Sequence, residues 1–122
     1  MWETVPVRLA GLEPGRITMT TQAEERHLNA FGGVHGGYVA AAMDTALGLT
    51  VFISLPHPDA RHTTVDLAVK IVKRIPLDVE LTIETSLVNI SRRLGVSQGT
   101  LRDADGVVYA HGTTSCMIKP AE

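Results

Sequence analysis

The sequence is poor in cysteine, in aromatic side chains and in excess charge, and each shortage narrows the possible functions. Cys116 is the only cysteine among 122 residues, so an intramolecular disulfide is excluded. Aromatic residues make up 4% of the chain, which gives little support to a pocket built on aromatic stacking. The formal net charge is −2, whereas binding to a phosphate backbone needs a concentrated basic surface. We therefore expect no nucleic acid as the main partner.

Several functional signatures are missing as well. The four histidines other than His35 have no metal-ligand spacing, and no G-x-S-x-G nucleophile motif occurs, so we expect no metal site. The first four residues lack the basic-then-apolar pattern of a signal peptide, which favours a cytoplasmic protein. The longest apolar stretch contains Asp44 and Gly48, which indicates a buried helix and not a membrane span.

The size and composition of the chain are those of one globular domain. Hydrophobic residues make up 44% and charged residues 20% of the sequence, which excludes a disordered or fibrous protein. No composition shift marks a boundary, so we expect a single domain over residues 1–122.

Residues 29–55 are the most informative stretch, because a glycine-rich loop leads there into a helix that is apolar on nearly every side. Asp44 is the one charged side chain between His35 and His57. A carboxylate among Ala, Met and Leu loses hydration that these neighbours cannot replace. The hypothesis is a catalytic carboxylate; a hydrogen bond to a neighbouring backbone group is the alternative.

Gly36 and Gly37 begin this helix. Free backbone N–H groups at a helix N-terminus attract developing negative charge, and glycine has no Cβ to keep a ligand oxygen away. The loop is therefore a candidate oxyanion hole, with a tight turn into the helix as the alternative. Eight residues of helix separate Gly36 from Asp44 by about 12 Å, too far for one site. Two copies of the helix packed against each other would solve this, which predicts a homodimer.

The rest of the chain predicts β-structure. Two extended pieces flank a turn at residues 13–15, the second a strand at residues 16–21, and a short helical turn is possible at residues 23–27. The long helix should end before Pro56. Further strands are expected at residues 62–74, 77–88, 91–102 and 107–119, with an Asp-Gly turn at residues 103–106. This order predicts an α+β fold, in which an antiparallel sheet of about five or six strands wraps around one central helix.

Two of the expected strands have clear faces. In residues 62–74 the alternation predicts one buried face, formed by Val65, Leu67, Val69 and Ile71. In the last strand, Ala110, Gly112 and Thr114 share a face with Cys116, and these small residues would let a helix lie close.

The motif N-x-x-G-x-x-H-G-G, followed by an acid eight residues after the first glycine of the pair, resembles the hotdog-fold acyl-CoA thioesterases of the phenylacetate-degradation (PaaI) type. That family includes one branch of 4-hydroxybenzoyl-CoA thioesterases. The motif comprises Asn29, Gly32, His35, Gly36, Gly37 and Asp44. Weaker similarities lie at residues 12–16, 64–66, 105–106 and 110–113, so the resemblance spans nearly the whole chain.

The resemblance implies roles for the catalytic residues. Asp44 would be the nucleophile or the general base on water, and the N–H of Gly36 would polarise the thioester carbonyl, the two coming from different subunits. Asn29 would position water or the acyl carbonyl, with a turn cap as the alternative. Thr64 would stand beside the acid, with an ordinary strand threonine as the alternative.

The resemblance also implies substrate-binding residues. His35 and Gly37 belong to the loop that receives the acyl group, where His35 is expected to fix the loop by hydrogen bonds and not to act as a base. Arg92 and Arg93 match positions that are often basic near the nucleotide part of coenzyme A, with a solvated turn as the alternative.

The sequence therefore predicts an acyl-CoA thioesterase that uses no cofactor other than the coenzyme A of its substrate. A carboxylate and one oxyanion donor suffice for this reaction without a metal. The expected assembly is a homodimer or a homotetramer. The alternative is a non-catalytic acyl-CoA-binding hotdog protein.

Overall fold

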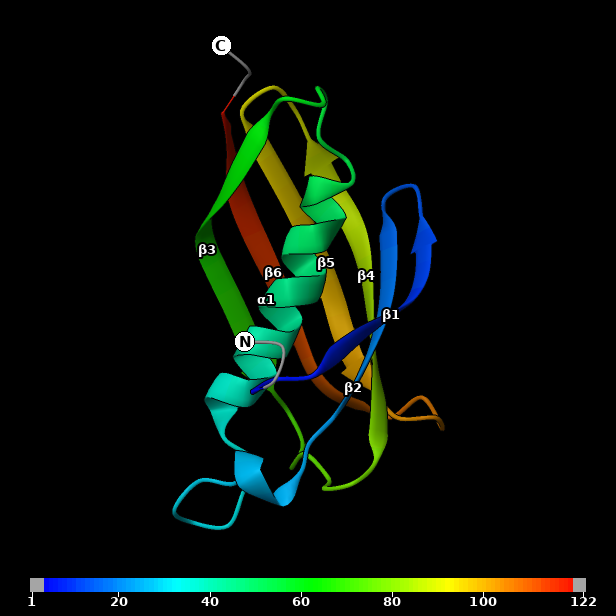
Figure 1. The fold of residues 1–122 in the computed structure, drawn as a ribbon, viewed down its shortest axis with the longest axis vertical. Helices are drawn as coiled ribbons and strands as arrows, with labels where there is room; N and C mark the ends of the chain where they lie inside the picture. Colours follow the sequence, from blue (N-terminus) through cyan, green and yellow to red (C-terminus); the bar gives the residue numbers. More distant parts are fainter. Residues whose placement is uncertain (1–3, 120–122) are drawn as a thin grey trace.

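The computed structural model describes residues 4–119, which form one sheet and one long helix (Figure 1). In chain order the elements are β1 (Val7–Glu13), β2 (Arg16–Gln22), the 3-10 turn η1 (Glu25–His27), α1 (Gly36–Phe52), β3 (Arg61–Ile71), β4 (Glu80–Ile90), β5 (Leu94–Arg102) and β6 (Val108–Lys119). The predicted turn at residues 23–27 and the predicted end of the helix before Pro56 are both confirmed.

The six strands lie in the order β1-β2-β4-β5-β6-β3, and every neighbouring pair is antiparallel. Figure 1 shows α1 running along one face of the curved sheet. The helix packs against β2, β3, β4, β5 and β6. The α+β arrangement expected from the sequence, an antiparallel sheet around one helix, is confirmed, with β1 and β3 as the edge strands.

Small residues on β5 and β6 let α1 lie close to the sheet, as the sequence predicted for the last strand. Gly99 and Gly112 are paired across these strands. A Cβ added to either glycine would point toward the helix. A Cβ at Gly112 would lie 2.8 Å from the carbonyl oxygen of Ala68 and 3.4 Å from Met43 Cε. Met43 and Leu47 of the helix are fully buried over these glycines. Each such buried side chain contributes about 1.5–3 kcal/mol to folding.

Strand β3 differs from the predicted pattern. Leu67 and Val69 pack against the core, but Val65 is 58% exposed and Ile71 is 45% exposed. The pairing with β6 jumps from Thr64–Cys116 to Asp66–Ser115, so Val65 is the extra residue of a β-bulge. The prediction of one continuous buried face was therefore wrong, because the bulge turns Val65 outward and the edge strand has no outer neighbour within this chain.

The other strands follow the prediction more closely. Strand β4 begins at Glu80, three residues later than expected, because Asp78 has a positive φ of 56° in the preceding loop. Leu81 and Ile83 are fully buried, as the alternation predicted. The Asp-Gly turn between β5 and β6 is present, and Gly106 adopts the left-handed conformation with φ 85°.

Candidate functional site

The start of α1 leaves one backbone donor free. His35 is the N-cap residue, and its Nδ1 accepts a hydrogen bond of 2.8 Å from the N–H of Gly37. The N–H of Tyr38 donates to the carbonyl oxygen of His35 at 3.0 Å. The N–H of Gly36 has no partner among residues 4–119, and Gly36 is exposed. Of the two glycine amides, the one from Gly36 is therefore open to a ligand, while that of Gly37 is used by the helix cap.

Asn29 organises the loop before the helix. Its Oδ1 accepts hydrogen bonds from the N–H groups of Phe31, at 2.9 Å, and Gly33, at 3.2 Å. The N–H of Asn29 donates to the carbonyl oxygen of Gly33 at 2.7 Å, and Arg74 donates to that of Gly32 at 2.9 Å. The turn-capping alternative thus describes what Asn29 Oδ1 does here. Its Nδ2 makes no hydrogen bond within the described residues and is available to a ligand.

Asp44 lies in the middle of α1 with one carboxylate oxygen in an unusual position. Its Oδ1 is buried and has no hydrogen-bond partner in the part of the chain that the structure describes. A buried acceptor without a partner costs about 1–3 kcal/mol. The alternative of a hydrogen bond to a neighbouring backbone group is therefore not observed for this oxygen. Asp44 needs a donor that residues 4–119 of this one chain do not supply.

Thr64 is on the helix side of β3, next to the bulge, where it pairs with the buried Cys116. Two contacts define how α1 is aligned with β3. A Cβ on Gly36 would lie 3.8 Å from Ile71 Cδ1, and the ring centroids of Phe52 and His62 are 5.9 Å apart. The middle of the helix therefore faces the middle of the strand, where the bulge lies. The Thr64 hydroxyl is 3.8 Å from Cys116 Sγ, and no hydrogen bond joins it to Asp44 in the described chain.

Other predicted residues lie far from this point. Gly36 and Asp44 are on one continuous helix, eight residues and about 12 Å apart, so one chain does not bring them together. Arg92 and Arg93 are exposed in the turn between β4 and β5. That turn lies at the C-terminal end of α1, since a Cβ on Gly95 would be 2.7 Å from Val51 Cγ1.

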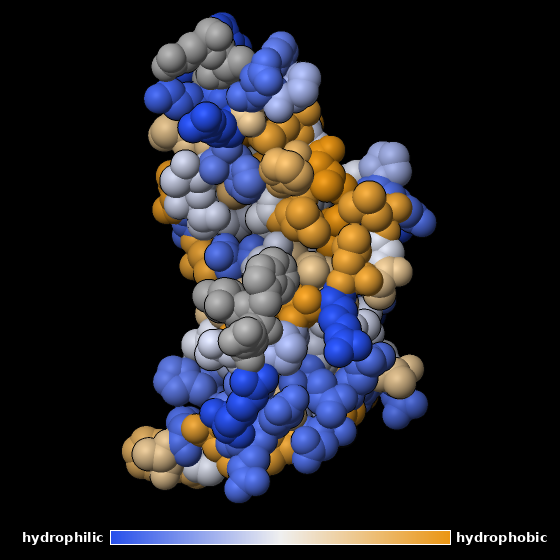
Figure 2. All heavy atoms as spheres, viewed as in Figure 1, coloured by the Kyte–Doolittle hydropathy of each residue, from blue (hydrophilic) through white to orange (hydrophobic). Residues whose placement is uncertain are grey.

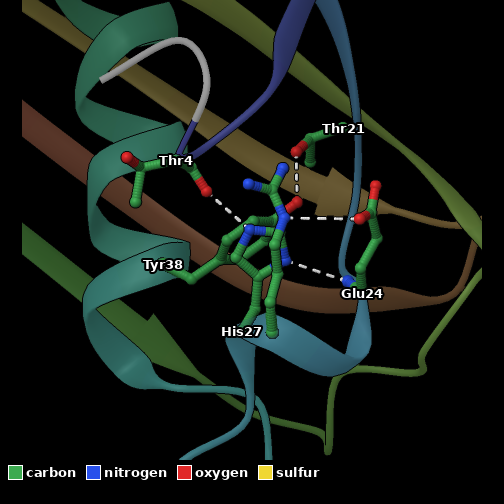
Figure 3. A network of polar contacts seen from close by, with 6 residues as sticks. Thr4, Thr21, Glu24, His27 and Tyr38 are labelled. Atoms are coloured by element: carbon green, nitrogen blue, oxygen red, sulfur yellow. Dashed lines mark hydrogen bonds and ion pairs between the residues drawn. The ribbon is translucent and has the colours of Figure 1, made fainter.

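A buried polar network adjoins the start of α1, and the sequence did not single it out (Figure 3). The ring of His27 lies against the ring of Tyr38, with centroids 4.4 Å apart. The Tyr38 hydroxyl is hydrogen-bonded to that of Thr21, and burial raises the pKa of Tyr38 above its usual value of 10.0. Histidine and tyrosine at this spacing carry no motif, so only the fold reveals their contact.

The opposite face of the sheet holds a groove of about 900 Å³. Its lining includes His111 and charged side chains of both signs: Glu13, Arg16, Glu84 and Arg102. None of the site residues predicted from the sequence lines it. The groove and the candidate site are therefore on different faces of the sheet.

Metal and membrane signatures are also absent from the described residues. No group of three or more His, Cys, Asp or Glu side chains among residues 4–119 is arranged to hold a metal ion. Within the same residues, α1 and η1 are too short or too polar to cross a bilayer.

Sequence comparison relates the chain to hydrolases. Residues 31–110 match the Thioesterase superfamily. A protein of Halobacterium salinarum that carries an esterase name is 38% identical over 68 residues, or 55% of this chain. The chain spans 44% of the length of that protein.

Solved structures with the same fold come from several bacteria. A thioesterase of Haemophilus influenzae has a TM-score of 0.86 and 16% identity, over 97% of this chain and 81% of its own. A hypothetical thioesterase of Streptococcus pneumoniae with coenzyme A has a TM-score of 0.84 and 22% identity, over 95% and 88%. A Streptococcus mutans protein bound to acetyl CoA has a TM-score of 0.84 and 22% identity, over 95% and 90%. These likenesses confirm the predicted hotdog fold.

Proposed function

The chain belongs to the Thioesterase superfamily, and we propose on this basis that it hydrolyses acyl-CoA thioesters to a free acid and coenzyme A. The observation that carries the proposal is the Oδ1 of Asp44, a buried acceptor without a partner in the described chain. A protein that only binds acyl-CoA has no need for a carboxylate in this costly position. This argument favours an enzyme over a non-catalytic binding protein.

The reaction needs two groups that the site can offer. The free N–H of Gly36, at the positive end of the helix dipole, would hydrogen-bond to the thioester carbonyl oxygen and stabilise the oxyanion that forms there. The carboxylate of Asp44 would either attack the carbonyl carbon or remove a proton from an attacking water. The tetrahedral intermediate would then expel the thiolate of coenzyme A. Asn29 Nδ2 and Thr64 are proposed to position the acyl group and the acid.

These two groups would come from two subunits. Asp44 is the only charged residue of α1, and the face of the helix turned away from the sheet carries Ala40, Ala41, Thr45, Gly48, Leu49 and Phe52. Surface helices are normally polar on that face. Figure 2 shows hydrophobic residues gathered on this side of the molecule, over the C-terminal half of α1 and toward the β1–β2 hairpin. We propose that a second copy covers this face.

Gly48 supports the same assembly. A glycine inside a helix costs about 1 kcal/mol relative to alanine, yet a Cβ at Gly48 would meet nothing within 4 Å in this chain. A second copy packed against this face could approach the helix backbone closely at Gly48. If the two helices are antiparallel about a twofold axis, Gly36 of each lies toward Asp44 of the other. The homodimer is the proposed unit, alone or paired into a homotetramer.

The antiparallel arrangement would also place two arginine side chains near the substrate. Arg92 and Arg93 lie at the C-terminal end of α1, which in such a dimer is beside the N-terminal end of the partner helix. Their guanidinium groups are therefore proposed to bind the phosphates of coenzyme A. Relatives of the same fold were solved with coenzyme A and with acetyl CoA, which supports this class of substrate. The motif around His35 favours the PaaI type within the superfamily.

The proposal is tested by thiol release from a panel of acyl-CoAs of short, medium and long chain, with phenylacetyl-CoA and hydroxybenzoyl-CoA. We expect wild-type turnover of at least one substrate and a loss of about a thousandfold or more in Asp44→Ala. The thermal stability of Asp44→Ala should be equal or higher, because an unpaired buried acceptor is removed. Asp59→Asn, an exposed acid, is the control and should keep full activity. Wild-type rates in Asp44→Ala would contradict the mechanism, and binding without turnover would favour the non-catalytic alternative.

A further inference from the structure

The proposed oxyanion donor, the N–H of Gly36, lies at the first turn of α1, where two glycines follow each other. Gly36 and Gly37 occupy the first two helical positions, and two consecutive glycines leave the backbone free to adopt many conformations. An oxyanion hole works because its donor already points to the right place before the reaction begins. Something outside the two glycines must therefore hold this end of the helix.

The residue before the glycines is held by His27. The N–H of His35 donates to the carbonyl oxygen of His27 at 2.8 Å. The ring of His27 is itself fixed at both nitrogens: Nδ1 accepts from the N–H of Glu24 at 2.9 Å, and Nε2 lies 2.5 Å from the carbonyl oxygen of Thr4. Because Nδ1 accepts, Nε2 carries the proton and donates to Thr4. His27 is only 7% exposed, so the side chain has no freedom to move away.

The residue after the glycines is Tyr38, and it is held by β2. Tyr38 is 4% exposed, and its hydroxyl is hydrogen-bonded to Thr21. The hydroxyl of Thr21 also donates to the carbonyl oxygen of Pro6 at 2.7 Å, so its single proton is used there and Tyr38 is the donor in the bond between them. Figure 3 shows the Tyr38 and His27 rings side by side, with Thr21 and Thr4 on either side of the pair.

We propose that His27 and Tyr38, whose rings are in contact, form a positioning clamp for the Gly36 N–H. His27 fixes His35 on one side of the two glycines, and Tyr38 fixes the helix on the other side. The contact between the two rings, with centroids 4.4 Å apart, joins these anchors into one unit. Neither residue touches the reacting atoms; both act through the direction of the Gly36 amide. The catalytic part of this inference rests on the proposed thioesterase function, and the structural part does not.

The chain offers a matched pair of variants, because it has two tyrosines and each hydroxyl makes one side-chain hydrogen bond. Tyr38→Phe keeps the ring on His27 and removes the bond to Thr21. Thr21→Val breaks the same bond from its other end and also removes the hydrogen bond from Thr21 to Pro6. Tyr109→Phe removes the bond to Asp103 near the β5–β6 turn and is the control.

Two readouts are measured on each variant: amide hydrogen exchange along the chain, and kcat and KM for the best acyl-CoA of the panel. For Tyr38→Phe and Thr21→Val we expect faster exchange confined to residues 33–38, kcat lower by about tenfold and KM nearly unchanged. The double variant should be no worse than Thr21→Val alone, since Thr21→Val already breaks the bond that Tyr38→Phe removes. Tyr109→Phe should change neither quantity.

Three results would overturn the clamp. These are unchanged exchange at residues 33–38, faster exchange there with wild-type kcat, and faster exchange spread over the whole sheet, which would mean an ordinary core role. If the wild-type protein hydrolyses no acyl-CoA, the thioesterase proposal fails, while the exchange of residues 33–38 still decides whether the pair holds the helix end.

Discussion

At the scale of single residues, the site depends on one free amide and one unpaired carboxylate oxygen. His35 takes the N–H of Gly37 for the helix cap, which leaves the N–H of Gly36 without a partner in the described chain. The two glycines of the motif therefore have different tasks, although the sequence presents them as equals. Gly37 keeps its proposed place next to the substrate, but its amide is already committed to His35.

A proline at position 36 tests the amide directly. Proline lacks the N–H and is favoured at the first helical position, and the preceding His35 already has the extended conformation, φ −60° and ψ 132°, that proline requires of its neighbour. We expect Gly36→Pro to fold and to lose roughly a hundredfold to a thousandfold in kcat. Gly36→Ala keeps the N–H, and within this chain its Cβ would meet only Ile71 Cδ1 at 3.8 Å, so it should retain more activity than Gly36→Pro. Equal activity of the two variants would exclude the Gly36 amide as the donor.

At the residue scale, the sequence could indicate candidate site residues where the chemistry is local. An acid in an apolar helix and a glycine pair before it are visible without a structure. The structure leaves Asp44 Oδ1 and the N–H of Gly36 without a partner in the described chain. His27 and Tyr38 were not visible, because their contact is made by a loop folding back on the helix and involves β2 and Thr4. The double use of Asn29, with Oδ1 in the turn and Nδ2 free, also requires the folded loop.

At the scale of elements, turns were easier to predict than strand faces. The Asp-Gly pattern at residues 103–106 predicted the β5–β6 hairpin because glycine supplies the positive φ of the turn. The bulge in β3 was not predictable, since Val65 continues the alternation of Leu67 and Val69. The bulge matters for the site, because it places Thr64 on the same side of β3 as Leu67, facing the helix.

The β5–β6 turn should make the free energy of unfolding depend on pH in the acidic range. The N–H of Val107, the hydroxyl of Tyr109 and the N–H of Asp105 donate to the Asp103 carboxylate and hold its pKa below the usual 3.8. Because the pKa of Asp103 is lower in the folded protein than in the unfolded chain, its carboxylate stabilises the fold fully at pH values above 3.8. This stabilisation is lost as the pH falls through the pKa of the folded protein. We therefore expect Asp103→Asn to lower the free energy of unfolding at pH 7, with the difference from wild type shrinking below pH 3.8.

Urea unfolding at a series of pH values from neutral to acid measures this difference. Asp105→Asn is the control in the same turn, because the Asp105 side chain makes no hydrogen bond in the described chain. A difference for Asp103→Asn that stays constant into strong acid, or that is absent at pH 7, would show that the charge of Asp103 does not stabilise the turn.

At the scale of the whole molecule, the sequence predicted the fold class and not the arrangement of the strands. Alternation and turns indicated antiparallel strands, but the pairing of β3 with β6 at the far edge joins residues that are distant in the chain. The length of α1 was predictable, and with it the separation of Gly36 from Asp44. That separation is confirmed by one continuous helix, so the two-subunit site remains the central prediction.

Mixing two inactive variants tests that prediction most directly. Asp44→Ala and Gly36→Pro are each expected to be inactive as homodimers, and subunit exchange between them produces hybrids with one site that has both groups intact. Random exchange of equal amounts should restore about a quarter of the wild-type thiol release, because half of the dimers are hybrids and each has one good site of two. The hybrid fraction is verified with an affinity tag on one variant. Recovery near this level would support a site shared between subunits, and no recovery with hybrids present would contradict it.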